Sequence, residues 1–160
     1  MRIRTLVVGI AGLISVVALA ATSTAQGQDP WAGTWKLNVA KSTYSPGPAP
    51  KSSTVTIASV DGGIKQTVDT VPATGAAQHW TVSAKFDGKD AASTGNPNAD
   101  TQAFTKTDDH HYTIAAKKGG KATTTSQVVI SADGKTRTNT QTGVDGQGKP
   151  VKNTLVYERQ

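Results

Sequence analysis

The sequence predicts an all-β protein whose strands form an antiparallel, up-and-down meander of about nine or ten strands. Three observations lead to this prediction. Apolar and polar residues alternate along most segments after residue 26, as on strands with one buried face. Short turn sequences rich in Gly and Asp separate these segments. No segment after residue 26 repeats apolar residues at helical spacing.

The first predicted strand covers residues 33–39 and places Trp35, Leu37 and Val39 on one face. The prolines of residues 45–50 then require a loop, because each proline removes a backbone donor. Later strands are expected over residues 53–60, 64–71, 78–86, a short stretch after 89, 100–104, 112–116, 121–131, 136–142 and 151–159. The predicted turns are Asp61-Gly62-Gly63, Asp87-Gly88-Lys89, Asp108-Asp109-His110, Gly119-Gly120, Asp133-Gly134-Lys135 and Gly146-Gln147-Gly148.

The hydrophobic core of this protein is expected to be thin. Leu, Ile, Val and Phe supply only 19 of the 135 residues from Gln26 onward, whereas Thr, which favours strands, supplies 21. A meander with thin apolar faces leaves two exposed edges, and closing into a barrel removes both. An interior lined partly by Thr, Gln and Asn can hold water or a ligand. We therefore expect a barrel with an internal cavity.

Residues 1–25 have the pattern of a secretory signal peptide, with Arg2 and Arg4 ahead of an apolar run and small residues up to Ala25. The run is shorter than the roughly 20 residues that span a bilayer, so no membrane span is expected after cleavage. Residues 26–160 are predicted to form a single periplasmic or secreted domain. The chain has no cysteine, which excludes disulfides, thiolate metal sites and cysteine nucleophiles.

Both ends of the predicted domain resemble a known family. Gly33-Thr34-Trp35-Lys36-Leu37 and Val156-Tyr157-Glu158-Arg159 resemble the two termini of the fatty-acid-binding proteins, and Gly33-x-Trp35 is similar to the opening motif of lipocalins. Both groups are calycins. The resemblance implies a calycin-like up-and-down barrel around a ligand cavity.

The chain also departs from the fatty-acid-binding pattern. That family inserts a two-helix lid after the first strand, where this chain has the proline-rich residues 41–51. It also holds the ligand carboxylate with two arginines, whose positions correspond here to Leu155 and to the neighbourhood of Gln127, so that Tyr157 alone remains. Because a buried carboxylate without a cation is costly, the resemblance implies a neutral, mostly apolar ligand, or no ligand, instead of a fatty acid.

Signals for catalysis and for metal binding are few. His79, His110 and His111 fit no catalytic motif, and on a strand the last two point to opposite faces. Most aspartates lie in turns, where they bond the backbone, and none has EF-hand spacing. We expect no enzyme, no cofactor and no metal. The alternatives are an unusual enzyme built on aspartates and a metal bound by residues 108–111, which otherwise form a solvated hairpin tip.

Partners other than a small molecule have weaker support. Lys117, Lys118 and Lys121 form a basic turn that is either simply solvated or meets an anionic surface polymer. Nucleic acid is not expected, because no aromatic platform lies among the basic residues. We expect a monomer.

The predicted function is binding of a small, mostly apolar molecule without chemical conversion. The inward-facing aromatic residues either line its cavity or simply fill the barrel, Trp31 is expected to close one end, and Phe104 is left on either face. The alternative is a structural or interaction module of the cell envelope, and the volume of the cavity separates the two. The candidate ligand-binding residues are Trp35, Trp80, Phe86, Tyr112, Gln127, Leu155 and Tyr157.

Overall fold

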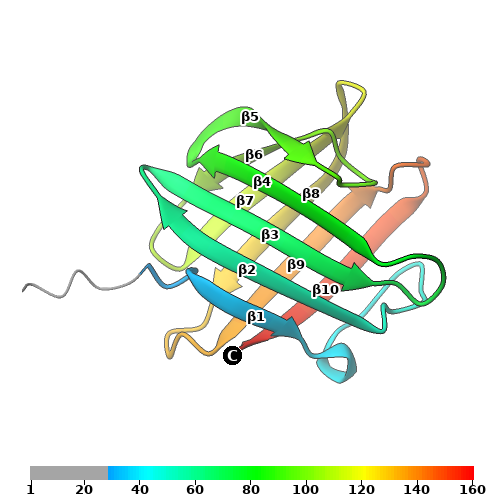
Figure 1. Cartoon of the computed structure of the whole chain (residues 1–160), viewed down its shortest axis with the longest axis horizontal. Coiled ribbons are helices and arrows are strands. Elements are labelled where there is room, and N and C mark those ends of the chain that lie inside the picture. Colours follow the sequence, from blue (N-terminus) through cyan, green and yellow to red (C-terminus); the bar gives the residue numbers. More distant parts are fainter. Residues whose placement is uncertain (1–28) are drawn as a thin grey trace, which may run out of the picture.

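The computed structural model describes residues 29–160, which form one closed barrel of ten antiparallel strands (Figure 1). The strand order around the barrel is β1-β10-β9-β8-β7-β6-β5-β4-β3-β2, so each strand pairs with its neighbour in the chain and β1 closes against β10. The all-β class, the meander and the closure are therefore confirmed. The predicted signal peptide, residues 1–25, lies outside the described residues.

The strands follow the predicted order, and one short 3-10 turn, η1 (Val39–Lys41), comes after the first of them. Most of the predicted turn sequences connect consecutive strands. The strands are β1 (Gly33–Leu37), β2 (Ser52–Val60), β3 (Gly63–Val71), β4 (Gln78–Lys85), β5 (Asp87–Thr94), β6 (Thr101–Lys106), β7 (His111–Lys118), β8 (Lys121–Ile130), β9 (Thr136–Val144) and β10 (Pro150–Arg159).

The prediction that the first strand extends to Val39 is wrong. The strand ends at Leu37, because the side-chain oxygen of Asn38 accepts a hydrogen bond from the Lys41 amide and turns the chain into η1. Val39 is consequently 37% exposed and adds nothing to the core.

The predicted turn at residues 87–89 is also wrong, because these residues belong to β5. The chain bends at Phe86, and Asp87 then pairs with Thr105 of β6. A bulge follows before regular pairing with β6 resumes. Pairing between β4 and β5 is therefore limited to two residue pairs, and β5 pairs mainly with β6.

An aromatic plug closes the end of the barrel where β1 begins. The ring centroids of Trp31, Phe86 and Tyr112 lie 5.1 to 6.3 Å apart in edge-to-face contacts, and Phe104 stacks on Tyr112. Trp31 therefore closes this end as predicted. Phe104, which the sequence left on either face, points inward and is fully buried.

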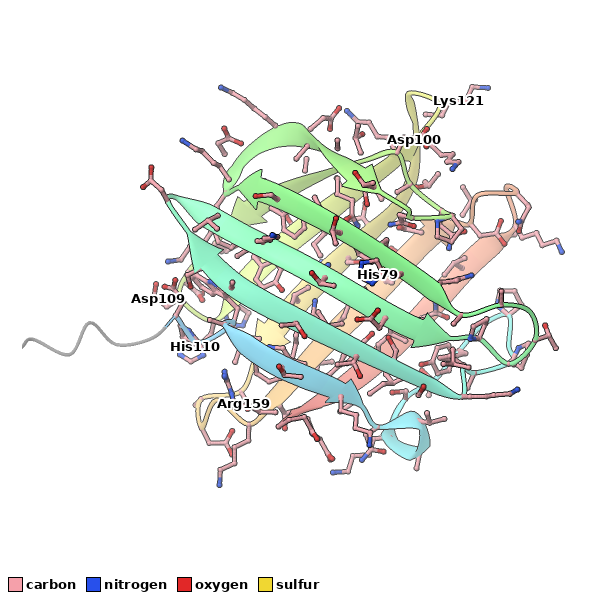
Figure 2. The ribbon with its side chains drawn as sticks, in the orientation of Figure 1. His79, Asp100, Asp109, His110, Lys121 and Arg159 are labelled. Atoms are coloured by element: carbon pink, nitrogen blue, oxygen red, sulfur yellow. The ribbon has the colours of Figure 1, made fainter. Side chains whose placement is uncertain are left out.

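Arg159, at the end of β10, joins this strand to residues 30–35 and to the β8–β9 turn. Its guanidinium lies 4.2 Å from the centre of the Trp35 ring, and its Nε donates a 2.6 Å hydrogen bond to the Gly134 carbonyl. The two Nη atoms donate to the carbonyls of Ala32 and Pro30. Figure 2 shows Arg159 at the same end of the barrel as Asp109 and His110, with Asp100 and Lys121 at the other end.

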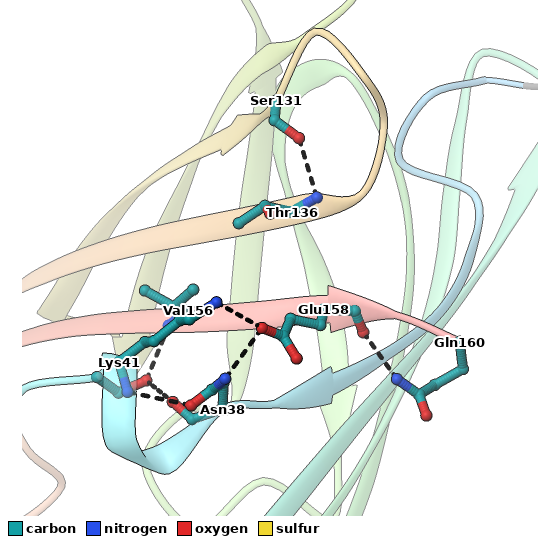
Figure 3. A network of polar contacts seen from close by, with 8 residues as sticks. Asn38, Lys41, Ser131, Thr136, Val156, Glu158 and Gln160 are labelled. Carbon is teal, nitrogen blue, oxygen red and sulfur yellow. Dashed lines mark hydrogen bonds and ion pairs between the residues drawn. The ribbon is translucent and has the colours of Figure 1, made fainter.

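A second contact joins β10 to the turn that follows β1. Glu158 accepts hydrogen bonds of 2.9 Å from both Asn38 and Lys41 (Figure 3). Hydrogen bonds from these two side chains, Lys41 first, lower the pKa of the Glu158 carboxyl. The seam between the first and last strands is thus held by side chains as well as by the short β1 ladder.

Candidate functional site

A cavity of about 360 Å³ opens at the end of the barrel opposite the plug. The proline-rich loop after η1 borders it through Tyr44 and Pro46, and the β3–β4 loop borders it through Pro72. A second space of about 200 Å³ lies inside the barrel. The two spaces adjoin, since six residues line both of them: Ser53, Thr70, Asn98, Gln141, Leu155 and Tyr157.

The inner cavity has a mainly polar wall. Its apolar lining comes from Val55, Val68, Trp80, Ile114 and Leu155. Side-chain amides are more numerous, and they are those of Gln66, Gln78, Asn96, Asn98, Gln102, Asn139 and Gln141. This wall is suited to a ligand that forms hydrogen bonds along its length.

Arg137 lies in the wall of the inner cavity and is only 1% exposed. The register of β9 turns it inward, because its partners across the two ladders are the buried residues Ile130 and Tyr157. Its Nε and Nη2 each lie 3.3 Å from the hydroxyl of Tyr112, and its Cζ lies 5.2 Å from the centre of the Tyr157 ring. Arg137 thus stands between the cavity and the aromatic plug.

The positive charge of Arg137 has no carboxylate partner among residues 29–160 within ion-pair distance. A guanidinium carries five N–H donors, and the hydrogen bonds of Arg137 to the described residues are the two that Nε and Nη2 donate to the Tyr112 hydroxyl. A buried charge without a partner is costly, and an anion that uses the free donors removes this cost. The arrangement can therefore bind an anionic group.

Tyr157 and Tyr44 do not supply a negative charge to the interior. Burial is the main cause that raises the pKa of Tyr157 above its ordinary value. At the mouth, burial and the nearby Tyr157 raise the pKa of Tyr44 to about 12. Both hydroxyls are therefore neutral at physiological pH, and the interior keeps the net positive charge of Arg137.

The predicted site residues are divided between the cavity, the plug and the outer surface. Trp80, Leu155 and Tyr157 line the inner cavity. Tyr112 bonds Arg137 from the plug, to which Phe86 also belongs. Trp35 is fully buried under Arg159, away from the cavity.

Gln127 does not reach the interior, contrary to prediction. It is exposed on the outer face of β8, whereas its neighbours Ser126 and Val128 are buried. Gln127 was named from the resemblance to the fatty-acid-binding proteins and not from the alternation of the strand, in which successive side chains point to opposite faces.

Sequence reasoning missed Arg137 as the interior cation. It looked for an arginine at the positions of Leu155 and Gln127, whereas the cation comes from β9. The available signal was the period-two set Arg137, Asn139 and Gln141, combined with the tight turn that pairs β9 with β8.

The remaining candidates lie on the surface. His79 faces outward as predicted and bonds Asp69 at 2.7 Å. His111 contacts Asp108 at 2.8 Å at the tip of a hairpin, and the pKa of that carboxyl is lowered chiefly by this hydrogen bond. Within residues 29–160, no group of three or more potential ligands is placed to hold a metal ion.

Aspartates accompany the predicted basic turn. Lys117 lies 2.7 Å from Asp90, and Lys118 lies 3.2 Å from Asp100. These ion pairs offset two of the three positive charges on which the suggestion of an anionic polymer depends.

Comparison with models of known protein families finds no match, and comparison with curated proteins finds none either. The likeness to calycins is accordingly a likeness of the closed antiparallel barrel itself. Among the residues that the structure describes, no helix has the length and apolar character of a membrane-crossing segment.

Proposed function

We propose that this protein is an exported, non-enzymatic barrel that binds a small molecule carrying an anionic group. The observation that carries the proposal is the buried, uncompensated charge of Arg137 in the wall of an internal cavity. Arg137 is the anchor for the anion, and the hydroxyl of Tyr112 holds its guanidinium in place. Leu155 and Tyr157 line both the cavity at the mouth and the inner cavity that holds this anchor.

The cavity lining supports binding without chemical conversion. The inner cavity has no His, Asp, Glu or Lys in its wall, and of the common general acids and bases it holds only Tyr157, whose pKa burial raises. The nucleophiles available there are the hydroxyls of Ser and Thr, which need an adjacent base to become reactive.

The proposal modifies the ligand expected from the sequence. That expectation was a neutral, mostly apolar molecule, chosen because no interior cation had been recognised. With Arg137 in the wall, a neutral apolar ligand leaves the guanidinium unpaired. A ligand that presents a carboxylate or a similar group to Arg137 forms charge-assisted hydrogen bonds instead.

Matched probes test the proposal. We expect cyclohexanecarboxylate to bind at least about tenfold more tightly than its neutral amide, because only the acid pairs with Arg137. Calorimetric titration of both probes measures this difference, and the fluorescence of Trp80, which lines the cavity, gives a second signal. Arg137→Met should abolish the preference, whereas Arg159→Met removes an arginine outside the cavity and should preserve it in the folded protein. Equal affinity for acid and amide in the unmodified protein would refute the proposal.

A further inference from the structure

We infer that the inner cavity selects a compact, polyhydroxylated anion, with the chemistry of a sugar acid. This inference deepens the proposed function and rests on it, because Arg137 still anchors the charged group. The additional argument comes from the amides of the cavity wall, which Arg137 does not explain.

The side-chain oxygens of two of these amides are buried without a hydrogen-bond partner. The oxygen atoms Oε1 of Gln66 and Oδ1 of Asn139 have no donor in the described part of the chain, and Gln66 is only 3% exposed. Gln102 has one weak contact, at 3.4 Å from the hydroxyl of Ser93. Buried polar groups are nearly always paired, so an unpaired amide in a cavity wall indicates a partner that occupies the cavity.

The partner that suits these amides is a hydroxyl group. The last torsion of Gln and Asn is broad, so the amides of Gln66 and Asn139 can turn toward the cavity that both residues line. An amide presents a donor and an acceptor, and a hydroxyl group both donates and accepts. A ligand hydroxyl can therefore form a hydrogen bond with either orientation of the amide, whereas an alkyl chain can form a hydrogen bond with neither.

The volume of the inner cavity favours a compact ligand. Its volume of about 200 Å³ is below the roughly 300–1,000 Å³ of sites for drug-sized molecules. Trp80 and Ile114 supply apolar wall against which the C–H groups of a ring can pack. A short polyol or a single sugar ring fits this description better than a long acyl chain.

Charge and hydroxyls are both needed for a complete match. A simple carboxylate would pair with Arg137 and leave the amides of Gln66 and Asn139 unsatisfied. A neutral sugar would satisfy the amides and leave the guanidinium without an anion. A sugar acid satisfies both sets of groups.

Three probes of similar ring size separate these contributions: glucuronate, cyclohexanecarboxylate and glucose. We expect glucuronate to bind at least about tenfold more tightly than either of the others, as measured by calorimetry on the full chain. Gln66→Leu and Asn139→Leu should each weaken glucuronate and leave cyclohexanecarboxylate unchanged. Gln127→Leu makes the same change on the outer face and should alter neither affinity.

The outcomes distinguish the inference from the proposed function. If both carboxylates bind equally well, the requirement for hydroxyls is overturned while the anion site stands. If glucose binds as tightly as glucuronate, or if no carboxylate binds, the anion site itself is overturned. The comparison of probes on the unmodified protein decides these outcomes even if a variant does not fold.

Discussion

Replacing Arg137 by Met is expected to make the ligand-free protein more stable while it removes anion binding. Arg137 is almost completely buried and has no carboxylate partner among the described residues, so its charge opposes folding. Met is uncharged and apolar, and its side chain reaches as far as the Nε position of Arg. A binding site that buries a charge lowers the free energy of unfolding, so removing the charge of Arg137 should raise it.

The expected magnitude follows from the contacts of Arg137. Substitution forfeits the two long hydrogen bonds to Tyr112 and the contact with the Tyr157 ring, together worth about 2 kcal/mol. It also removes the cost of burying a charge, which amounts to several kcal/mol even after relaxation (of the order of 3–5 kcal/mol). The net gain in the free energy of unfolding is about 1–3 kcal/mol, or roughly 3–10 °C in melting temperature for a domain of this size.

Urea and thermal unfolding of the full chain, both without ligand, measure this gain. The matched control is Arg159→Met, since Arg159 bonds three backbone carbonyls and covers Trp35. Its removal leaves those carbonyls unpaired and is expected to destabilise the protein by about 2–4 kcal/mol. Substitution by Met should thus raise the free energy of unfolding at Arg137 and lower it at Arg159.

A loss of stability in Arg137→Met as large as that in Arg159→Met would refute the reasoning. It would mean that the protein itself satisfies the Arg137 guanidinium, and the case for an anionic ligand would lose its basis.

Three further predictions concern the fold. Trp35→Ala removes a fully buried ring and should lower the free energy of unfolding by about 3–5 kcal/mol; an unchanged melting temperature would contradict its place under Arg159. Gly143→Ala should destabilise by more than about 2 kcal/mol, because φ is +130° and the new Cβ would lie 2.1 Å from the Thr123 carbonyl oxygen. Gly148→Ala, at φ +82° in open space, should cost less, and urea unfolding that ranks the two equally would contradict the steric argument. Stability should also fall as the pH drops below the ordinary carboxyl range near about 4, because hydrogen bonds lower the folded-state pKa of several exposed carboxyls, so the unfolded chain takes up protons first. Thermal unfolding at a series of pH values checks this, and a constant melting temperature would contradict it. The carboxyls concerned are those of Asp100, Asp108, Asp133 and Glu158.

Local signals were sufficient to predict most of the fold. Alternation placed Trp80, Tyr112 and Tyr157 on inner faces, and all three point into the barrel or its plug. The error at Val39 arose because the Asn38 side chain caps η1 and ends the strand, and the error at residues 87–89 arose at a bulge in β5. Alternation of apolar and polar residues predicts neither feature.

The candidate site was harder to predict, because β9 is polar on both faces. Alternation divides this strand into one set with Arg137, Asn139 and Gln141 and a second set of threonines, but neither set is apolar enough to identify the inner face. Gln127 was wrong for another reason, since it was taken from the resemblance to the fatty-acid-binding proteins and lies on the outer face of β8.

The sequence by itself determined the strand class, the order of the hairpins and the aromatic inner faces, since these depend on contacts between near neighbours in the chain. Only the tertiary structure decided that Arg137 and the amides share one cavity. The ladders that β9 forms with β8 and β10 turn Arg137 inward beside Ile130 and Tyr157. Closure of the barrel then brings Arg137 together with Gln66 from β3. The chemistry of the interior is therefore a property of register and closure, which involve residues far apart in the sequence.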